Sequence, residues 1–173
     1  MRKAIAALLL AKTLVACSSS EPEAGKATFD ADTTPPNPSI SLRARALDGR
    51  TLTLNVVTHG VDELYGAAFR LSYDPRSLRF VELARGSAFS DRTDVSVLGR
   101  ETQAGLLIGV ATLVGQSRGA PLKAAGEATI ATVTLAIDSR SSSRIDFVPG
   151  RSVALDEGGR EIVLGTSGGR LSF

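Results

Sequence analysis

Apolar and polar residues alternate through most of the chain, with the two-residue period of strands that bury one face. The clearest case is residues 65–81, where Phe69, Leu71 and Tyr73 fall on the face predicted to enter the core. Asp74-Pro75 should end this strand, because proline fixes φ and has no amide donor, and a second strand should follow. The opposite, outward face of the first strand carries Gly66, Ala68, Arg70 and Ser72.

The same alternation predicts about nine short strands, whereas no window of adequate length shows the 3.6-residue period of a helix. It recurs at residues 40–46, 52–56, 95–97, 105–114 and 126–137 and in shorter pieces between 145 and 173. Asp48-Gly49 and Gly158-Gly159 are typical of hairpin turns. The apolar phase shifts between Phe80 and Val81, which predicts a β-bulge. We therefore predict an all-β sandwich or barrel over residues 40–173.

The first 17 residues are predicted to be a lipoprotein signal peptide. Arg2-Lys3 precede the apolar residues 4–11, a run too short to span a membrane as a helix. Leu14-Val15-Ala16-Cys17 resembles the lipobox of bacterial lipoproteins, in which the cysteine is lipidated and becomes the mature N-terminus. The resemblance implies lipidation of Cys17, anchoring in the bacterial cell envelope and, with serine at position 18, sorting to the outer membrane. The alternative is an ordinary signal peptide with a chance cysteine.

Residues 18–39 are rich in Ser, Thr, Pro and acidic residues and contain one aromatic side chain. Such a segment buries too little apolar surface to fold by itself, and its prolines favour an extended backbone. We predict that it is a disordered tether between the membrane anchor and the domain. Fully extended, it would reach about 70–80 Å.

The basic pI near 9.0 comes largely from the N-terminus. Residues 1–16 contain three basic residues and no acidic one; without them, 17 basic residues face 18 acidic ones, a net charge of −1. The domain has no like-charge run, and a phosphate-binding face needs clustered Lys and Arg, so we exclude nucleic acid as a partner. Cys17 is the only cysteine, so the chain has no internal disulfide.

One motif resembles a catalytic serine. Gly165-Thr166-Ser167-Gly168-Gly169 matches the G-x-S-x-G pattern, and His59 is the single histidine. The hydrolase elbow needs a strand-to-helix turn and a histidine after the serine, and no histidine follows Ser167. We interpret Ser167 as part of a glycine-rich turn before the last strand and His59 as a loop residue at a strand end.

The carboxylate pairs give no stronger indication of chemistry. Asp62-Glu63 and Asp156-Glu157 are neighbours in turns, whereas a glycosidase needs two acids facing one cleft. The oxygen-rich loop 156–161 would suit calcium, but Arg160 lies in its middle. We therefore predict no enzyme activity, no metal site and no cofactor.

Three motifs resemble cohesin domains in their order and spacing. Residues 65–81 resemble the third and fourth cohesin strands, where an amphipathic strand ends in Tyr-Asp-Pro and a Leu-x-Phe-Val strand follows. Residues 105–114 resemble the sixth strand, and residues 126–135 resemble the glycine-led seventh strand. The resemblance spans about residues 39–173 and implies a nine-stranded jelly-roll β-sandwich, a fold related to some carbohydrate-binding modules.

The resemblance also implies a binding face. In cohesins, the sheet of strands 8, 3, 6 and 5 binds dockerin modules with its flat outer side. Matched position by position, that side here consists of Gly66, Ala68, Arg70 and Ser72 on the third strand and Leu107, Gly109, Ala111 and Leu113 on the sixth. Many cellulosomal cohesins have Asn or Asp where this chain has Gly66 and Ala68, so the face here is small and apolar, with Arg70 near its middle.

Three functions follow from these patterns. The first is a monomeric, membrane-tethered adaptor that binds a protein on another chain, a dockerin-like one being the family's precedent. The second is a carbohydrate-binding module that presents a polysaccharide site from the envelope; the third is a structural envelope component. The chain has no tryptophan and only Tyr65 and Tyr73 as tyrosines, which disfavours sugar stacking. We favour the adaptor.

Overall fold

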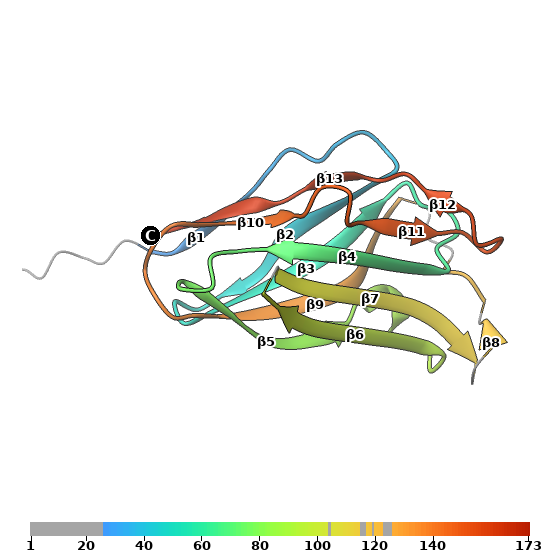
Figure 1. The fold of residues 1–173 in the computed structure, drawn as a ribbon, viewed down its shortest axis with the longest axis horizontal. Helices are drawn as coiled ribbons and strands as arrows, with labels where there is room; N and C mark the ends of the chain where they lie inside the picture. The colour runs from blue at the N-terminus through green and yellow to red at the C-terminus, as the bar shows by residue number, and fades with distance from the viewer. Residues whose placement is uncertain (1–25, 104, 115–116, 119, 123–125) are drawn as a thin grey trace, which may run out of the picture.

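The computed structural model describes residues 26–103, 105–114, 117–118, 120–122 and 126–173, and only the backbone of 112–114 and 117–118. Within them, the strands form two facing sheets (Figure 1). The first sheet holds β1 (Thr28–Ala31), β4 (Gly66–Ser72), β6 (Val95–Thr102), β7 (Gly105–Val114), β8 (Ser117–Arg118), β10 (Ser143–Phe147), β11 (Val153–Leu155), β12 (Glu161–Ile162) and β14 (Gly169–Ser172). The second holds β2 (Ser39–Leu47), β3 (Thr51–His59), β5 (Leu78–Arg85), β9 (Glu127–Ile137) and β13 (Gly165–Ser167).

The predicted all-β jelly-roll sandwich is confirmed, although the described strands are more numerous and shorter than expected. One cause is that β10 and β11 share the same edge of β4. Asp146 and Phe147 pair with the end of β4, and Val153–Leu155 pair with its beginning. A further element, the 3₁₀ turn η1 (Ser87–Phe89), follows β5. The central order of the first sheet is therefore β10 and β11, then β4, β7 and β6.

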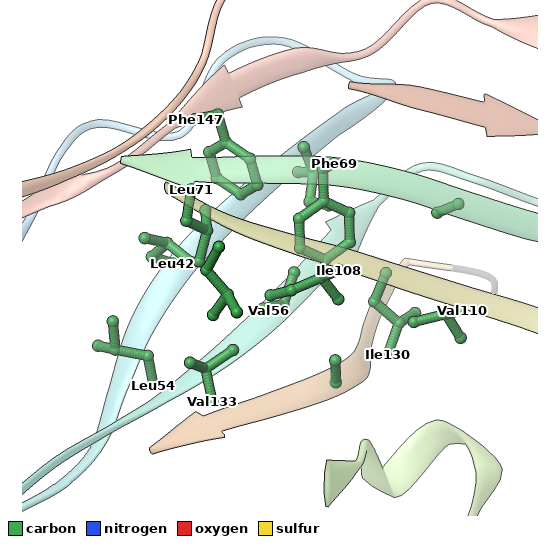
Figure 2. Packing of buried hydrophobic residues seen from close by; sticks show 14 of the residues in the cluster. Leu42, Leu54, Val56, Phe69, Leu71, Ile108, Val110, Ile130, Val133 and Phe147 are labelled. Atoms are coloured by element: carbon green, nitrogen blue, oxygen red, sulfur yellow. The ribbon is translucent and has the colours of Figure 1, made fainter. Parts of the chain in front are cut away.

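The core lies between the two sheets, where the inward faces of the alternating strands meet (Figure 2). Phe69 and Leu71 of β4 are 1% and 0% exposed, as the alternation predicted. The Phe69 ring meets Phe147 edge-on, with ring centroids 5.6 Å apart. From the second sheet, the core receives Leu42, Leu54, Val56, Ile130 and Val133.

Tyr73 differs from its predicted place inside the core. It lies one residue beyond β4, half-buried at the end of the sandwich, and packs against the core cluster. Its hydroxyl donates a hydrogen bond of 2.5 Å to the Glu101 carboxylate. Burial and this carboxylate raise the pKa of Tyr73 above its usual value. The phenol needs a polar partner, so the ring stays at the margin where Glu101 can reach it.

The phase shift predicted at Phe80 and Val81 is a β-bulge. The pairing of β5 with β9 slips between Phe80 and Glu82, which leaves Val81 51% exposed. The bulge keeps both Phe80 and Leu83 turned toward the sandwich, where they pack against the core.

The predicted tether of residues 18–39 is wrong for its second half. Residues 28–31 form β1, which pairs antiparallel with β14, and Ser39 already belongs to β2. Asp32 is tied to β10, because Arg144 donates to its carboxylate at 2.6 Å and to Asp146 at 2.8 Å. A short strand of this kind needs the edge of β14 as its partner, and the local sequence does not reveal that edge. Cys17 and residues 18–25 lie outside the described residues.

No helix in the described ranges is long and apolar enough to cross a membrane.

Candidate functional site

The outward residues predicted on β4 lie on the outer side of the first sheet. In β4, Ala67, Phe69 and Leu71 are buried toward the core, whereas Ala68, Arg70 and Ser72 are half-buried on the other side. Gly66 continues that outer row at the start of the strand and is buried there. The alternation along β4 therefore has the phase that the sequence indicated.

The predicted residues of β7 lie directly beside them. The antiparallel register pairs Gly66 with Ala111, Ala68 with Gly109 and Arg70 with Leu107. Directly opposite residues of an antiparallel pair point to the same side of the sheet, so these six form one surface. Leu113 is described only through its backbone, which pairs with Arg118 in β8.

The next strand, β6, extends the surface with residues that the sequence did not single out. Ser96, Leu98 and Arg100 are exposed and pair with Ala111, Gly109 and Leu107, respectively. On the other side, β11 places Leu155 beside Gly66 and Val153 beside Ala68. The alternation of residues 95–100 was visible in the sequence, but its register against β7 was not.

The surface is hollowed where its residues are smallest. A depression of about 340 Å³ has Gly66, Ala68, Gly109 and Ala111 in its floor. Taller apolar side chains border it: Leu98 from β6 and Val153 and Leu155 from β11. The lining also includes Tyr65, Ala67, Ser96 and Val110. Leu98 is 63% exposed and is one of three large apolar side chains that are more than half exposed within the described residues. A partner's apolar side chain would find both space and contact here.

Arg70 lies at one end of the depression. Arg70 is half-buried, and its backbone neighbours are Leu107 in β7 and Val148 after β10. Its Nε is buried without a hydrogen-bond partner. Leaving such a donor unsatisfied costs about 1–3 kcal/mol. Arg100 is exposed two strands away in the same transverse row.

Two carboxylates that are close to these arginines in sequence or in strand register, Asp146 and Glu101, are already paired. Asp146 accepts two hydrogen bonds of 2.8 Å from Arg144, and Glu101 accepts from Tyr73. The hydrogen bonds of Arg144 to Asp146 and Asp32 together raise the pKa of this arginine. Within the described residues, neither Arg70 nor Arg100 forms an ion pair. The apolar depression therefore ends in positive charge.

His59 is buried, contrary to its predicted place in a loop. It is the last residue of β3, 5% exposed, and its Nε2 lies 2.7 Å from Ser41 Oγ. Its Nδ1 lies 3.3 Å from Glu127, which also accepts two hydrogen bonds from Arg43. Burial lowers the pKa of His59, with Arg43 adding to the effect, while Glu127 opposes it. The Arg43 guanidinium holds the pKa of Glu127 below its usual value.

This serine–histidine–glutamate arrangement is structural. Ser41 is 2% exposed and lies within β2, so a substrate cannot approach its hydroxyl. Ser167, the serine of the glycine-rich motif, belongs to β13 and is 7% exposed rather than in a turn. The histidine bonds Ser41, so it does not complete a triad with the motif.

The other candidate for chemistry was the acidic loop that follows β11. The Asp156 carboxylate accepts from Arg160 Nε at 2.7 Å and from the Arg160 amide at 2.9 Å. These hydrogen bonds lower the pKa of Asp156 and occupy the oxygens that a cation would need. No group of three or more His, Cys, Asp or Glu side chains suited to a metal occurs within the described part of the chain.

The two-sheet fold and its open outer face define a β-sandwich module, and comparison with known proteins gives the family. A family model of the cohesin domain matches residues 43–169. The chain therefore belongs to the cohesin family, as the three sequence motifs predicted. A search of curated proteins found no match.

Solved structures agree on the fold. A type II cohesin domain from the cellulosome of Acetivibrio cellulolyticus is 16% identical, with a TM-score of 0.59 over 78% of this chain and 94% of its own. A cohesin module from a Clostridium perfringens family 33 glycoside hydrolase is 14% identical, with a TM-score of 0.60 over 84% and 96%. A type I cohesin–dockerin complex from Clostridium thermocellum contains a chain that is 19% identical, with a TM-score of 0.57 over 70% and 83%.

Proposed function

We propose that this chain is a non-catalytic adaptor that binds a protein on another chain through the outer surface of β11, β4, β7 and β6. The observation that carries the proposal is the apolar depression over Gly66, Ala68, Gly109 and Ala111, bordered by the exposed Leu98. Concave apolar surfaces with a few polar anchors are typical of binding sites. The cohesin–dockerin complex among the similar structures supports a dockerin-like module as the partner.

The membrane anchor belongs to the same proposal. Lipidation of Cys17 would hold the protein at the envelope, because several acyl chains together give stable attachment. The segment before β1, residues 18–27, would then be the tether. It has 10 residues rather than the 22 predicted for 18–39, so its extended reach would be about 33–36 Å. The adaptor would thus present its binding face at a limited distance from the membrane.

A variant at Gly109 tests the binding face. A Cβ at Gly109 would meet only Leu98 Cβ, at 4.0 Å, so Gly109→Phe should fold normally while filling the depression. Immobilised full-length protein should capture a defined envelope or secreted protein, and its affinity for that protein, once purified, should fall at least about tenfold in the variant. Arg45→Gln, an exposed change on the second sheet, is the matched control and should bind normally.

Two results would contradict the proposal. Equal affinity of the wild type and Gly109→Phe would place binding elsewhere on the molecule. Glycan-array binding that is retained when no protein is captured would instead support the polysaccharide function. Tyr65 is the one aromatic residue in the lining of the depression, so the surface has little of the flat aromatic area that sugars stack on.

A further inference from the structure

The partner-facing surface is divided into an apolar part and a basic part. The transverse rows through Ala68 and Gly66 carry small or aliphatic residues and one serine. The next row along the strands carries Arg100, Leu107 and Arg70 in that order across β6, β7 and β4. With strands about 4.8 Å apart, the two arginine Cα atoms are separated by about 10 Å.

Arg70 has the stronger requirement for a ligand of the two arginines. It is half-buried, and its Nε is a buried donor without an acceptor, whereas Arg100 is exposed to water. The carboxylates at this end of the sandwich are paired with Arg144 and Tyr73. A planar guanidinium in an apolar setting is best satisfied by a carboxylate, which accepts two parallel hydrogen bonds.

The geometry of the surface favours a helix as the binding element. The face of a sheet offers side chains and no free backbone groups, so an extended peptide would gain no ladder hydrogen bonds there. A helix has its backbone groups satisfied internally. Arg70 lies two and four residues along β4 from Ala68 and Gly66, or about 7–13 Å. On a helix, residues i, i+4 and i, i+7 are about 6 and 10 Å apart along the axis.

Resting on the protein-binding role proposed above, we propose that the partner presents a helix with two features. An aliphatic side chain fills the depression, and an Asp or Glu one to two turns away pairs with Arg70. Arg70 is then the residue that selects the charge of the partner, and Arg100 strengthens the approach of acidic helices from the rim. A partner with a basic residue at that position is rejected, because it would bury like charges together.

A displayed library of helical peptides, randomised on one face, tests this proposal directly with the full-length protein carrying Cys17→Ser as bait. Selection on that protein should enrich an aliphatic residue with Asp or Glu four or seven positions away. Selection on the bait with Arg70→Glu should enrich Lys or Arg at the same position. Peptides from the first selection should bind the Arg70→Glu bait at least about thirtyfold more weakly, the lower end of what disrupting a buried charge pair does.

Three further baits distinguish the site of binding from the selection of charge at Arg70. Arg45→Glu, on the exposed outer part of β2, should leave binding unchanged, and Arg100→Glu should weaken it about fivefold or less because that arginine is exposed. Gly109→Phe should abolish binding of the selected peptides. Peptides that no longer bind the Gly109→Phe bait but show no acidic enrichment would overturn the charge selection and leave the adaptor function standing. Peptides that bind the Arg70→Glu bait as tightly as the wild type would do the same. A selection with no enrichment, or peptides indifferent to Gly109→Phe, would overturn both.

Discussion

A buried histidine links the stability of this domain to pH. His59 is held by Ser41 and faces Glu127 and Arg43 at the border of the second sheet. Its folded-state pKa is lowered, chiefly by burial, from about 6.5 in an unfolded chain. Between the two pKa values the unfolded chain binds more protons, so stability rises with pH there. The contribution is fully present above about pH 6.5 and is lost as pH falls through the folded-state pKa.

Replacing this histidine should flatten the acid side of the stability profile. We expect His59→Gln to lose less unfolding free energy than the wild type between about pH 7.5 and pH 5, because glutamine does not titrate. Urea unfolding at several pH values measures the difference. Comparison with wild type cancels the titration of Glu127 and the other carboxylates to first order. A variant whose profile runs parallel to that of the wild type would contradict this role of His59.

Among the elements, β1 is a short strand that joins the fold through pairing with a strand far away in the sequence. Its backbone pairs with β14 over four residue pairs, and the Phe29 ring packs against Gly169, where any Cβ would collide with it. Glycine is therefore needed at position 169 for close packing rather than for a special backbone conformation. The strand covers the edge of β14 that an unpaired sheet would expose.

The packing of β1 predicts a moderate loss of stability on truncation of its one large side chain. Phe29→Ala should lower the unfolding free energy by about 1–2 kcal/mol, less than for a fully buried phenylalanine because the ring is only half-buried. Thr28→Ala, an exposed change in the same strand, should cost about 0.5 kcal/mol or less. Chemical denaturation measures both. Equal effects of the two changes would show that β1 contributes no packing of its own.

At the scale of the whole molecule, the core and the proposed binding surface lie on opposite sides of the first sheet. The second sheet and the inward faces of β4 and β7 form the core, while the outer sides of β4, β7, β6 and β11 remain available for a partner. Both chain ends of the domain lie together, because β1 pairs with β14 (Figure 1). A lipid anchor that precedes β1 would therefore tether the end of the sandwich that also carries the C-terminus.

The anchor proposal makes a prediction for the whole protein in its cell. Cys17→Ser should move the protein from the membrane fraction to the soluble fraction and should abolish incorporation of labelled palmitate, because the acylated sulfur is lost. Ser19→Ala, two residues away, is the control and should leave both readouts unchanged. Membrane association that survives Cys17→Ser would contradict lipidation as the means of attachment.

Most of the architecture and part of the site were predictable from the sequence. Alternation gave the strands, and proline and glycine placed the turns, because these effects act within a few residues. The family motifs identified Gly66, Ala68, Arg70 and the residues of β7 as one surface. Leu98, Val153 and Leu155, which border the depression, were missed, since their neighbours on the sheet belong to strands far away in the sequence.

The sequence by itself determined the class of fold and the inward or outward phase of β4, because a two-residue period is a local property of the chain. Only the tertiary structure decided the long-range pairings. These pairings recruited β1 from the predicted tether, buried His59 against Ser41, and set Leu98 opposite Gly109. They also left Arg70 half-buried without an acceptor at the edge of an apolar depression. Register and burial arise from the packing of whole sheets, and no local pattern specifies them.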